Sequence, residues 1–592
     1  MNREAYLGVT SSATGRFWAD RLDSAMAREA EAIAAMQGVP MILARIAAGR
    51  GIGVAGAAAF LQPRLRDSLP DPSVLLDMDK AVARLVSAIE ADEKIAIFGD
   101  YDVDGACSSA LLGDYLRGFG LDPLVHIPDR LTEGYGPNEE AIRALHGRGA
   151  RLLVCVDCGT SGHQPLAAAA RLGMDVIVLD HHQAPETLPD VHALVNPNRL
   201  DDLSCLGHLC AAGVVFLALA GLNRALRAAG KRVPDLMSAI DLVALASVAD
   251  VVPLTGLNRA FVAQGLKVMR ARERIGLAAL ADVARLDAEP EAWHLGFLLG
   301  PRINAGGRIG DAALGAKLLM SRELGEAREI AARLDLLNRE RQAVEEAMLA
   351  EAEADALAQV GPEESGRASL VVSGANWHPG IVGIVAGRLK ERFRRPAFAI
   401  AMGEEGLATG SGRSIAGADL GAAVRAAVEA GILVKGGGHA MAAGVTLESS
   451  RIADFAAFLE ARLAGAVSDA LALDALQIDA ALTAESLTAD FALLLGEAGP
   501  FGQGNPEPVI ALPAHKLVDL RDIKGQHLKA TLQSAGGNRI EAMAFRAVGR
   551  PLGEALASLR GQLIHVVANV GRDMWGGKPR ASLRILDIAR AG

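Results

Sequence analysis

The chain has 592 residues, 51% of them hydrophobic, and a formal net charge of −10. One hydrophobic core does not serve a chain of this length, so we expect roughly three or four domains. The net negative charge argues against a protein that binds nucleic acid through its overall charge alone, so a polyanion has to bind to a local group of basic residues. Five cysteines are too few and too odd in number for a disulfide framework, which favours a reducing, cytoplasmic location.

The apolar segments predict a protein that does not enter a membrane. Residues 1–15 lack an apolar core of signal-peptide length. The longest apolar run, near Cys210–Leu222, is shorter than the roughly 20 residues that a bilayer requires. We therefore expect no targeting segment and no membrane span.

The first half of the chain changes from a helical to an α/β pattern. Residues 1–90 are expected to be helical, ending in an amphipathic helix over Asp79–Ala91. From residue 94 to about residue 252, continuous apolar runs alternate with helical segments, which predicts a parallel sheet covered on both faces. Residues 253–320 predict further helices with a glycine-rich turn at Gly300–Gly310. The predicted strands are Ile95–Phe98, Leu152–Val156 and Val176–Leu179.

The second half begins with a long helix predicted over Glu323–Gln359, which links two lobes. A second α/β pattern starts at Leu370–Val372 and runs through the glycine-rich Gly436–Gly444 to a helix near Ile452–Leu463. Past Pro500, alternating runs predict strands and a small terminal barrel. The expected domains are 1–90 (N-terminal helical region), 91–320 (catalytic α/β domain), 321–360 (connecting helix), 361–466 (second α/β domain) and 467–592 (β-barrel).

Acidic and imidazole side chains follow all three predicted strands and the end of a later predicted helix. Because the carboxyl ends of parallel strands meet at one edge of a sheet, we expect these side chains to converge there. Carboxylates at such an edge repel one another unless cations neutralise them. The candidate residues are Asp100, Asp102, Asp104, Asp157, His181, His182 and Asp250.

This mixture of carboxylate and imidazole ligands suits Mn²⁺ or Mg²⁺ better than the sulfur-rich shell of structural zinc. Two such ions about 3.5–4 Å apart activate a water and stabilise the leaving oxygen of a displacement at phosphorus, so the predicted reaction is phosphoester hydrolysis.

Three other interpretations of these residues remain open at this stage. Aspartates that cap helices after strands are common and often do no chemistry. The alternate aspartates of Asp100–Asp104 resemble the opening of an EF-hand, but no glutamate stands at the twelfth position. Cys155-x-x-Cys158 could pair with Cys205, His208 and Cys210 in a zinc site, although the spacing of the second group is poor.

Four motifs resemble those of the DHH-family phosphoesterases, and six more resemble the single-stranded-DNA exonucleases of that family. The two departures, Val103 and Gly306 where relatives carry alanine, affect no candidate ligand. The four are Gly99-Asp-Tyr-Asp-Val-Asp-Gly105, Val156-Asp-Cys-Gly159, Asp180-His-His182 and Val248-Ala-Asp250. The six are Arg130–Gly136, Gly300–Arg308, Trp377–Gly380, Ser411–Ser414, Gly436–His439 and Phe501–Pro506.

The resemblance implies a DHH catalytic lobe, a long linking helix, a DHH-associated lobe and a C-terminal oligonucleotide-binding (OB) barrel. It implies a 5′-to-3′ exonuclease that degrades single-stranded DNA to 5′-mononucleotides with Mn²⁺ or Mg²⁺, in repair and recombination. The implied protein is a monomer that works with a helicase and a single-strand-binding protein. His182 then lies near the scissile phosphate, Asp104 and Asp157 are catalytic, and the metal ligands are Asp100, Asp102, Asp104, Asp157, His181 and Asp250.

Substrate contacts are expected mainly in the second lobe. The glycine cluster Gly436–Gly444 allows backbone amides to approach a phosphate. The alternative interpretation of this cluster is a tight turn that packs helices. His378 is expected near a helix N-terminus, where anions are favoured. By resemblance, Arg130 forms the 5′-phosphate pocket with Ser411 and Arg413, which we expect in a glycine-rich loop. The other implied contacts are Arg302, Asn304, Arg308, His378, Gly437, Gly438 and His439.

Two further hypotheses compete with the exonuclease. One is a phosphodiesterase for very short oligonucleotides or cyclic dinucleotides, and the other is a noncatalytic DNA-binding scaffold. The basic cluster Arg388–Arg395 is more typical of a solvated helix face than of a DNA contact. Phe545 and Trp575 are the main aromatic candidates for base stacking in the terminal barrel.

Overall fold

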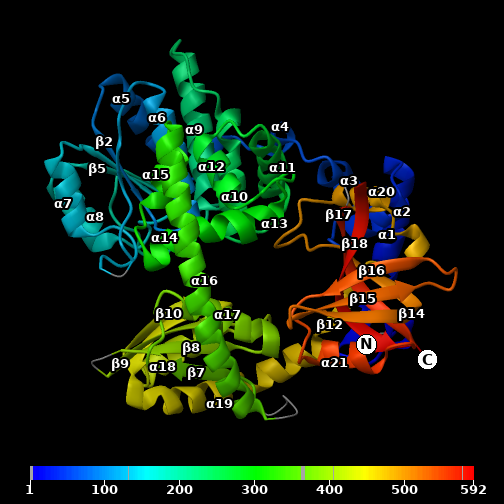
Figure 1. Ribbon diagram of the computed structural model, residues 1–592. Helices are drawn as coiled ribbons and strands as arrows, with labels where there is room; N and C mark the ends of the chain where they lie inside the picture. The colour runs from blue at the N-terminus through cyan, green and yellow to red at the C-terminus, as the bar shows by residue number, and fades with distance from the viewer. Residues whose placement is uncertain (1–3, 131, 362–366, 404–405, 576–577, 592) are drawn as a thin grey trace. The chain divides into compact units, whose positions relative to one another are not determined.

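The computed structural model describes residues 4–130, 132–361, 367–403, 406–575 and 578–591 (Figure 1). The side chain of Trp575 lies outside this description. The chain forms two compact units. Unit 1 comprises Met1–Gly307, Asp311–Ala332 and Ala475–Gly592, and unit 2 comprises Arg308–Gly310 and Arg333–Asp474.

A five-stranded parallel sheet forms the centre of the catalytic domain in unit 1, in the order β3-β2-β4-β5-β6, which confirms the predicted parallel sheet. Every residue of β2 and β4 is buried, as expected for strands covered on both faces. Helices α7 and α8 cover one face, and α6 and α9 pack on the other (Figure 1). The bounds are β2 Ile95–Gly99, α6 Val103–Arg117, β3 Leu124–His126, α7 Glu139–Gly147, β4 Leu152–Val156, α8 His163–Arg171, β5 Asp175–Leu179, β6 Ala193–Val195 and α9 Ala211–Ala228.

Helix α9 is long and apolar enough to cross a membrane by length and composition, and 72% of it is buried inside the structure. It packs on α5 and α6, so we describe it as a core helix. The helices that complete this domain are α5 Met78–Glu90, α10 Ile240–Ala249, α11 Gly256–Arg270, α12 Ile275–Val283, α13 Ala292–His294, α14 Gly300–Ile309 and α15 Leu314–Met320.

The predicted glycine-rich turn at Gly300–Gly310 is wrong, because this segment is helix α14, preceded by a π-helical turn over Leu295–Leu299. The glycines permit close packing instead. A Cβ added to Gly307 would lie only 2.5 Å from the carbonyl oxygen of Tyr101, so a side chain there would push the helix off the loop that follows β2.

The N-terminal segment and the C-terminal barrel share their cores in unit 1. Strand β1 pairs in parallel with β12, and Trp18 of β1 donates from Nε1 to the buried carboxylate of Asp587 in β18 at 3.1 Å. The predicted terminal barrel is confirmed, because pairing between β14 and β17 closes the sheet. The bounds are β1 Phe17–Asp20, α1 Ser24–Gln37, α2 Met41–Ala48, α3 Val54–Leu61, α4 Leu65–Ser68, β12 Ala475–Ile478, β13 Ala480–Ala481, α20 Ala489–Gly496, β14 Val509–Ile523, β15 His527–Gln533, β16 Arg539–Ala544, α21 Pro551–Ser558, β17 Leu563–Trp575 and β18 Lys578–Arg590.

Unit 2 contains a five-stranded sheet in the order β10-β11-β9-β8-β7. Ser411 and Arg413 lie in β9, not in the loop that we predicted, and Gly437 and Gly438 lie in β10. Glycine has no side chain, and this hides the alternation of inward and outward residues that identifies a strand. The bounds are α16 Leu324–Val360, which spans both units as the predicted long helix, β7 Leu370–Gly374, α17 Val382–Phe393, β8 Ala397–Met402, β9 Leu407–Arg413, α18 Leu420–Glu429, β10 Lys435–His439, β11 Ala442–Glu448 and α19 Ile452–Leu473.

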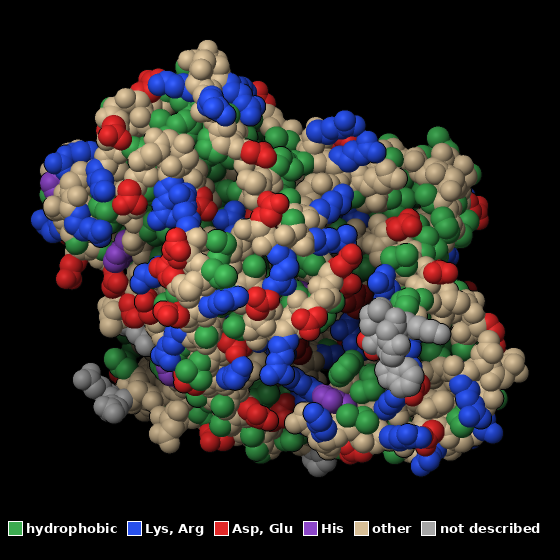
Figure 2. Space-filling model, turned by 45° about the horizontal axis from the view of Figure 1, so that its top comes forward, with side chains coloured by type: hydrophobic (Ala, Val, Ile, Leu, Met, Phe, Trp, Pro, Cys, Tyr) green, Lys and Arg blue, Asp and Glu red, His purple; other side chains and the backbone are tan. Residues whose placement is uncertain are grey.

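The basic cluster Arg388–Arg395 is occupied by contacts within unit 2. Arg388 lies 3.2 Å from Glu345, Arg394 lies 2.9 Å from Asp474, and the buried Arg395 donates to the carbonyl of Phe393. These arginines join secondary-structure elements instead of forming a free cationic surface. On the visible face of the molecule, lysine and arginine side chains are interspersed with acidic ones (Figure 2).

A buried arginine joins α11 to the segment before the barrel. Arg259 is 3% exposed, and its guanidinium lies 4.0 Å from the ring centre of Phe60. It donates to the carbonyls of Phe60, Ala498, Gly499 and Pro500 at 2.6–3.3 Å. Burial lowers its pKa to about 10, so it remains charged at neutral pH.

We predict that Arg259→Met lowers the free energy of unfolding by about 3 kcal/mol, because four carbonyls, two of them in buried hydrogen bonds, lose a charged donor. Guanidinium denaturation measures this value. Gln264→Met on the same helix is the matched control, since it removes one neutral hydrogen bond, to Pro63, and should cost about 1 kcal/mol. Equal losses for the two variants would contradict the role of the charge.

Candidate metal centre

Three aspartates converge in the turn between β2 and α6. Asp100 follows β2 and is 4% exposed, and Asp102 caps α6 by accepting from the amides of Asp104 and Gly105 at 2.9 and 3.1 Å. A Cβ on Gly105 would lie 2.3 Å from the carbonyl oxygen of Asp100, so only glycine allows this tight turn. The turn therefore presents its carboxylates at the carboxyl edge of the sheet.

Asp104 is held by the first turn of another helix. Its carboxylate accepts from the amides of Ala211 and Ala212 at 2.6 and 2.8 Å, at the start of α9. Free amides and the positive end of the dipole make a helix N-terminus favourable for an anion. The same carboxylate lies 3.7 Å from Nε2 of His181, so the helix fixes it beside the imidazole.

Asp157 and Asp250 approach the same imidazole from two other elements. Asp157 directly follows β4 with a φ of 61°, a left-handed conformation that aspartate tolerates better than most residues. Its Oδ1 lies 3.3 Å from Nε2 of His181. Asp250 is the C-cap residue of α10, and its Oδ2 lies 3.6 Å from the same nitrogen.

The orientation of His181 presents Nε2 to the carboxylates. Its Nδ1 lies 3.0 Å from the carbonyl oxygen of Leu209. Because a carbonyl oxygen can only accept a hydrogen bond, Nδ1 carries the hydrogen of the neutral ring and Nε2 carries the lone pair. A metal-binding imidazole commonly has this arrangement. Asn198 adds a further restraint by donating to the carbonyl of His181 at 2.5 Å.

Asp180 organises both histidines, a role that sequence reasoning missed. One of its oxygens accepts from the amides of His181 and His182 at 2.8 and 3.2 Å, and from Nδ1 of His182 at 2.8 Å. Burial opposes the charge on His182, but the hydrogen bond to Asp180 and the negative charges of the surrounding aspartates together outweigh it and raise the pKa of His182 to about 9. Tyr135, also missed, places its hydroxyl 3.3 Å from Nε2 of His182. The only sequence signal for Asp180 was its place at the end of a strand, next to the histidine pair.

The donor set fits divalent cations. Three overlapping groups bring one ligand atom from each member within 4.8 Å of the others, and none of them contains a cysteine among the described residues. Oδ1 of Asp100 and Oδ1 of Asp157 are buried without a hydrogen-bond partner, which is costly unless a cation is their partner. The groups are Asp100, Asp102 and Asp157; Asp104, His181 and Asp250; and Asp157, His181 and His182.

The carboxylates are held at high pKa values by burial and by one another. Burial, followed by the charge of Asp102, raises the pKa of Asp100 to about 8. Burial, followed by the charge of Asp104, raises the pKa of Asp250 to about 9. Burial also raises the pKa values of Asp104 and Asp157. Cations would therefore compete with protons for this site.

Two of the other candidate residues of unit 1, Arg130 and Asn304, contact the turn that leads into α6. Arg130 packs over the ring of Tyr101, with 5.3 Å to its centre. Asn304 accepts from the amide of Val103 at 3.2 Å, which ties α14 to the start of α6. Arg302 donates to the carbonyl of Leu298 at 2.6 Å.

The candidates in unit 2 form two groups. Strand register puts Ser411 and Gly437 in one row across Gly444 of the intervening strand β11. Arg413 and His439 occupy the next row, and Arg413 donates to Oγ of Ser411 at 3.0 Å. One patch of the sheet therefore carries a serine, an arginine, a histidine and glycine backbone.

The second group of unit 2 lies before α17. Arg308 donates to the carbonyl of Gly380 at 2.8 Å, and the amide of Gly380 donates to Nδ1 of His378 at 3.0 Å. His378 therefore lies four residues ahead of α17, where its ring nitrogen orders the turn into the helix.

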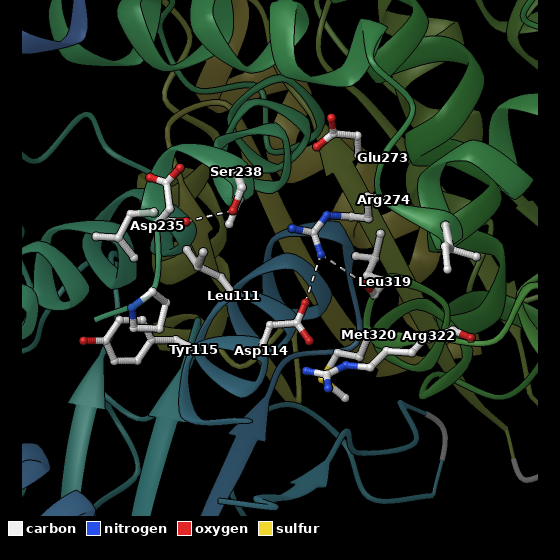
Figure 3. Close-up of a pocket in the computed structure, with 15 residues that line it drawn as sticks. Leu111, Asp114, Tyr115, Asp235, Ser238, Glu273, Arg274, Leu319, Met320 and Arg322 are labelled. Atoms are coloured by element: carbon white, nitrogen blue, oxygen red, sulfur yellow. Dashed lines mark hydrogen bonds and ion pairs between the residues drawn. The ribbon is translucent and has the colours of Figure 1, made fainter. Parts of the chain in front are cut away.

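A pocket of about 330 Å³ opens at the other end of α6 (Figure 3). Arg274 bridges Asp114 and Asp241 there at 3.0 Å to each. None of the described residues that line it belongs to the acidic cluster. Surface concavity and the chemistry of the donor set thus point to different places, and the donor set identifies the site.

We predict that the metal-free protein loses stability as the pH rises from about 6 to 9. The raised pKa values mean that the folded state binds more protons than the unfolded chain in this range, so the stability that protonation provides is lost as the carboxylates ionise. The loss should be on the order of 2–4 kcal/mol. Thermal unfolding in EDTA measures it, and saturating Mn²⁺ should remove most of the dependence. A flat profile in EDTA would contradict the charge crowding.

Comparisons with known proteins agree with this geometry. Three family models match: the DHH family N-terminal domain over residues 94–247, the DHHA1 domain over 367–465 and the RecJ OB domain over 478–587. The chain is 37% identical to the single-stranded-DNA-specific exonuclease RecJ of Salmonella typhimurium over 88% of this chain and 91% of that protein. It is 33% identical to the RecJ of Bacillus subtilis over 93% and 68% of the two chains.

Solved structures show the same relationship. The crystal structure of Thermus thermophilus RecJ in complex with Mn²⁺ matches with a TM-score of 0.77 and 29% identity, over 96% of this chain and 78% of that one. A crystal structure of exonuclease RecJ bound to manganese matches with a TM-score of 0.56 and 35% identity, over 67% and 95% of the two chains. The chain therefore belongs to the RecJ family of metal-dependent DHH exonucleases.

Proposed function

We propose that this chain hydrolyses single-stranded DNA from its 5′ end to 5′-mononucleotides, using two divalent cations, Mn²⁺ or Mg²⁺. One observation carries the proposal: the buried carboxylates and the Nε2 atom of His181 converge at one sheet edge, with two carboxylate oxygens left without partners. Relatives named as single-stranded-DNA-specific exonucleases supply the substrate class, and the family resemblance supplies the polarity.

The proposed roles follow from the contacts. Bound divalent cations would neutralise charge on the phosphate and lower the pKa of an attacking water. His182, kept protonated by Asp180, would donate a hydrogen bond from Nε2 to an oxygen of the scissile phosphate. The proposed ligands are Asp100, Asp102, Asp104, Asp157, His181 and Asp250, with Asp104 and Asp157 also serving catalysis.

We propose that the sheet patch of unit 2 receives the 5′-terminal phosphate. The guanidinium fork of Arg413 suits a phosphate with free oxygens, and Ser411 adds a hydroxyl donor beside it. Glycine backbone at Gly437 and Gly438, next to His439, allows amides to approach. The remaining proposed strand contacts are Arg130, Arg302, Asn304, Arg308 and His378.

The cellular setting is proposed from the family alone. We propose a cytoplasmic monomer in DNA repair and recombination, supplied with single strands by a helicase and a single-strand-binding protein. We propose that residues 467–592 bind the strand, 91–320 carry out the chemistry, 321–360 link the two lobes and 361–466 recognise the strand end.

We predict that Asp157→Asn lowers Mn²⁺-dependent release of nucleotides from single-stranded DNA at least about 100-fold. The amide keeps the size of the side chain but removes a charge and a ligand oxygen. Because it also relieves repulsion, the metal-free variant should melt at a higher temperature than the wild type at pH 8. Glu186→Gln, an exposed acid beyond the histidine pair, is the control and should change neither value. Full activity of Asp157→Asn would refute the site.

We predict that Arg413→Ala loses the preference for a 5′-phosphorylated strand. The wild type should release a 5′ label before a 3′ label, and should degrade phosphorylated strands about tenfold faster than 5′-hydroxyl strands. In the variant the two rates should converge. Arg451→Ala, which removes an exposed arginine paired with Asp454, is the control in the same unit. A preserved preference in Arg413→Ala would show that the end is recognised elsewhere.

A further inference from the structure

Two aromatic side chains of the helical run that leads into α14 stand exposed without a role in the chemistry above. Phe297 is 77% exposed and Trp293 is 48% exposed, in a chain with only 4% aromatic residues. Both belong to the helical run that passes through the π-helical turn Leu295–Leu299 into α14. Residues four apart in such a run lie on one side of it, and π-helical turns occur frequently at functional sites.

The ring of Trp293 is held in place from one side. It packs on the ring of His294 with 3.8 Å between ring centres and 33° between the planes. His294 is itself 6% exposed, and its Nδ1 accepts from the amide of Glu291 at 2.9 Å. One face of the indole is therefore covered by a fixed neighbour, and about half of the side chain remains open to solvent.

The helical run that carries the aromatic pair packs, through its glycines, against residues that adjoin two candidate ligands. A Cβ on Gly296 would lie 3.3 Å from Cγ1 of Val248, and a Cβ on Gly300 would lie 3.2 Å from Cβ of Ala249. These two residues directly precede Asp250. The Gly300 position is also 3.8 Å from Cγ2 of Val103, the residue before Asp104. The run that carries the aromatics thus lies against side chains of the residues next to two candidate ligands, Asp104 and Asp250.

We propose that Trp293 and Phe297 form a stacking surface for a nucleobase of the single strand whose phosphate is held at the metal centre. The inference rests on the proposed function and extends it to a base-binding subsite. A nucleobase fits better than a protein partner, because every base has a flat π-face and stacking is tolerant of sequence, as an exonuclease requires. Arg302 and Asn304, which we propose as contacts to the strand backbone, lie further along the same run in α14.

The test is kinetic. Trp293→Ala/Phe297→Ala should raise the KM for an oligonucleotide about tenfold with little change in kcat, because one stacked base contributes to binding and not to the chemical step. Phe297→Trp should restore most of the loss of Phe297→Ala, and Phe297→Leu should not. Met36→Ala, which removes an apolar side chain 72% exposed on α1, is the matched control.

Strands with abasic sites over the first nucleotides separate stacking from structural damage. The wild type should bind them about tenfold more weakly than normal strands, and the double variant should show no further loss. An equal loss on normal and abasic strands would overturn the proposal, as would an unchanged KM on normal strands, which would leave a protein partner as the occupant of this face. Absence of wild-type activity on any single strand would instead refute the proposed function.

Discussion

Repulsion between buried carboxylates is the constraint on which this structure depends. Asp100, Asp104, Asp157 and Asp250 are at most about a quarter exposed, and the charges of Asp100, Asp104 and Asp250 each raise the pKa of Asp157, which burial has already raised. A folded chain can tolerate such a cluster in two ways, by binding protons or by binding cations. Asp100 and Asp157 each have a buried oxygen without a hydrogen-bond partner, and this favours cation binding over protonation. A proton satisfies one oxygen, whereas a cation bridges several.

The fold resists this repulsion with rigid backbone. Strands β2 and β4, buried along their full length, end at the cluster, so apolar packing opposes any spreading of the strand ends. Main-chain amides of α9 hold Asp104, and Asp180 accepts from two successive amides of the histidine pair. A carboxylate held by amides keeps its position whether or not a cation is bound, and this pre-organises the site.

Strand-end acids were predictable because parallel strands share one carboxyl edge, and this rule located Asp100 and Asp157 from local sequence. The bracing role of Asp180 was not predictable, because an aspartate beside two histidines has the same local pattern whether it binds metal or orients rings. Glycine misled in both units: at Gly307 it allows close helix packing, and around Ser411 it hides a strand. Both effects depend on tertiary neighbours that no local pattern records.

Hydrogen bonds to the main chain also connect the metal centre to the segment before the barrel. The chain that leaves Asp250 soon reaches Leu254, whose amide donates to the carbonyl of Gln503 at 2.7 Å. Asn505 of the same motif donates to the carbonyls of Ala498 and Pro500, which is also a partner of Arg259. Backbone carbonyls are thus the common acceptors, and their positions do not depend on side-chain rotamers. The hydrogen bond from Leu254 lies only four residues beyond the candidate ligand Asp250. A displacement of the segment around Gln503 would therefore reach Asp250 through a short length of backbone.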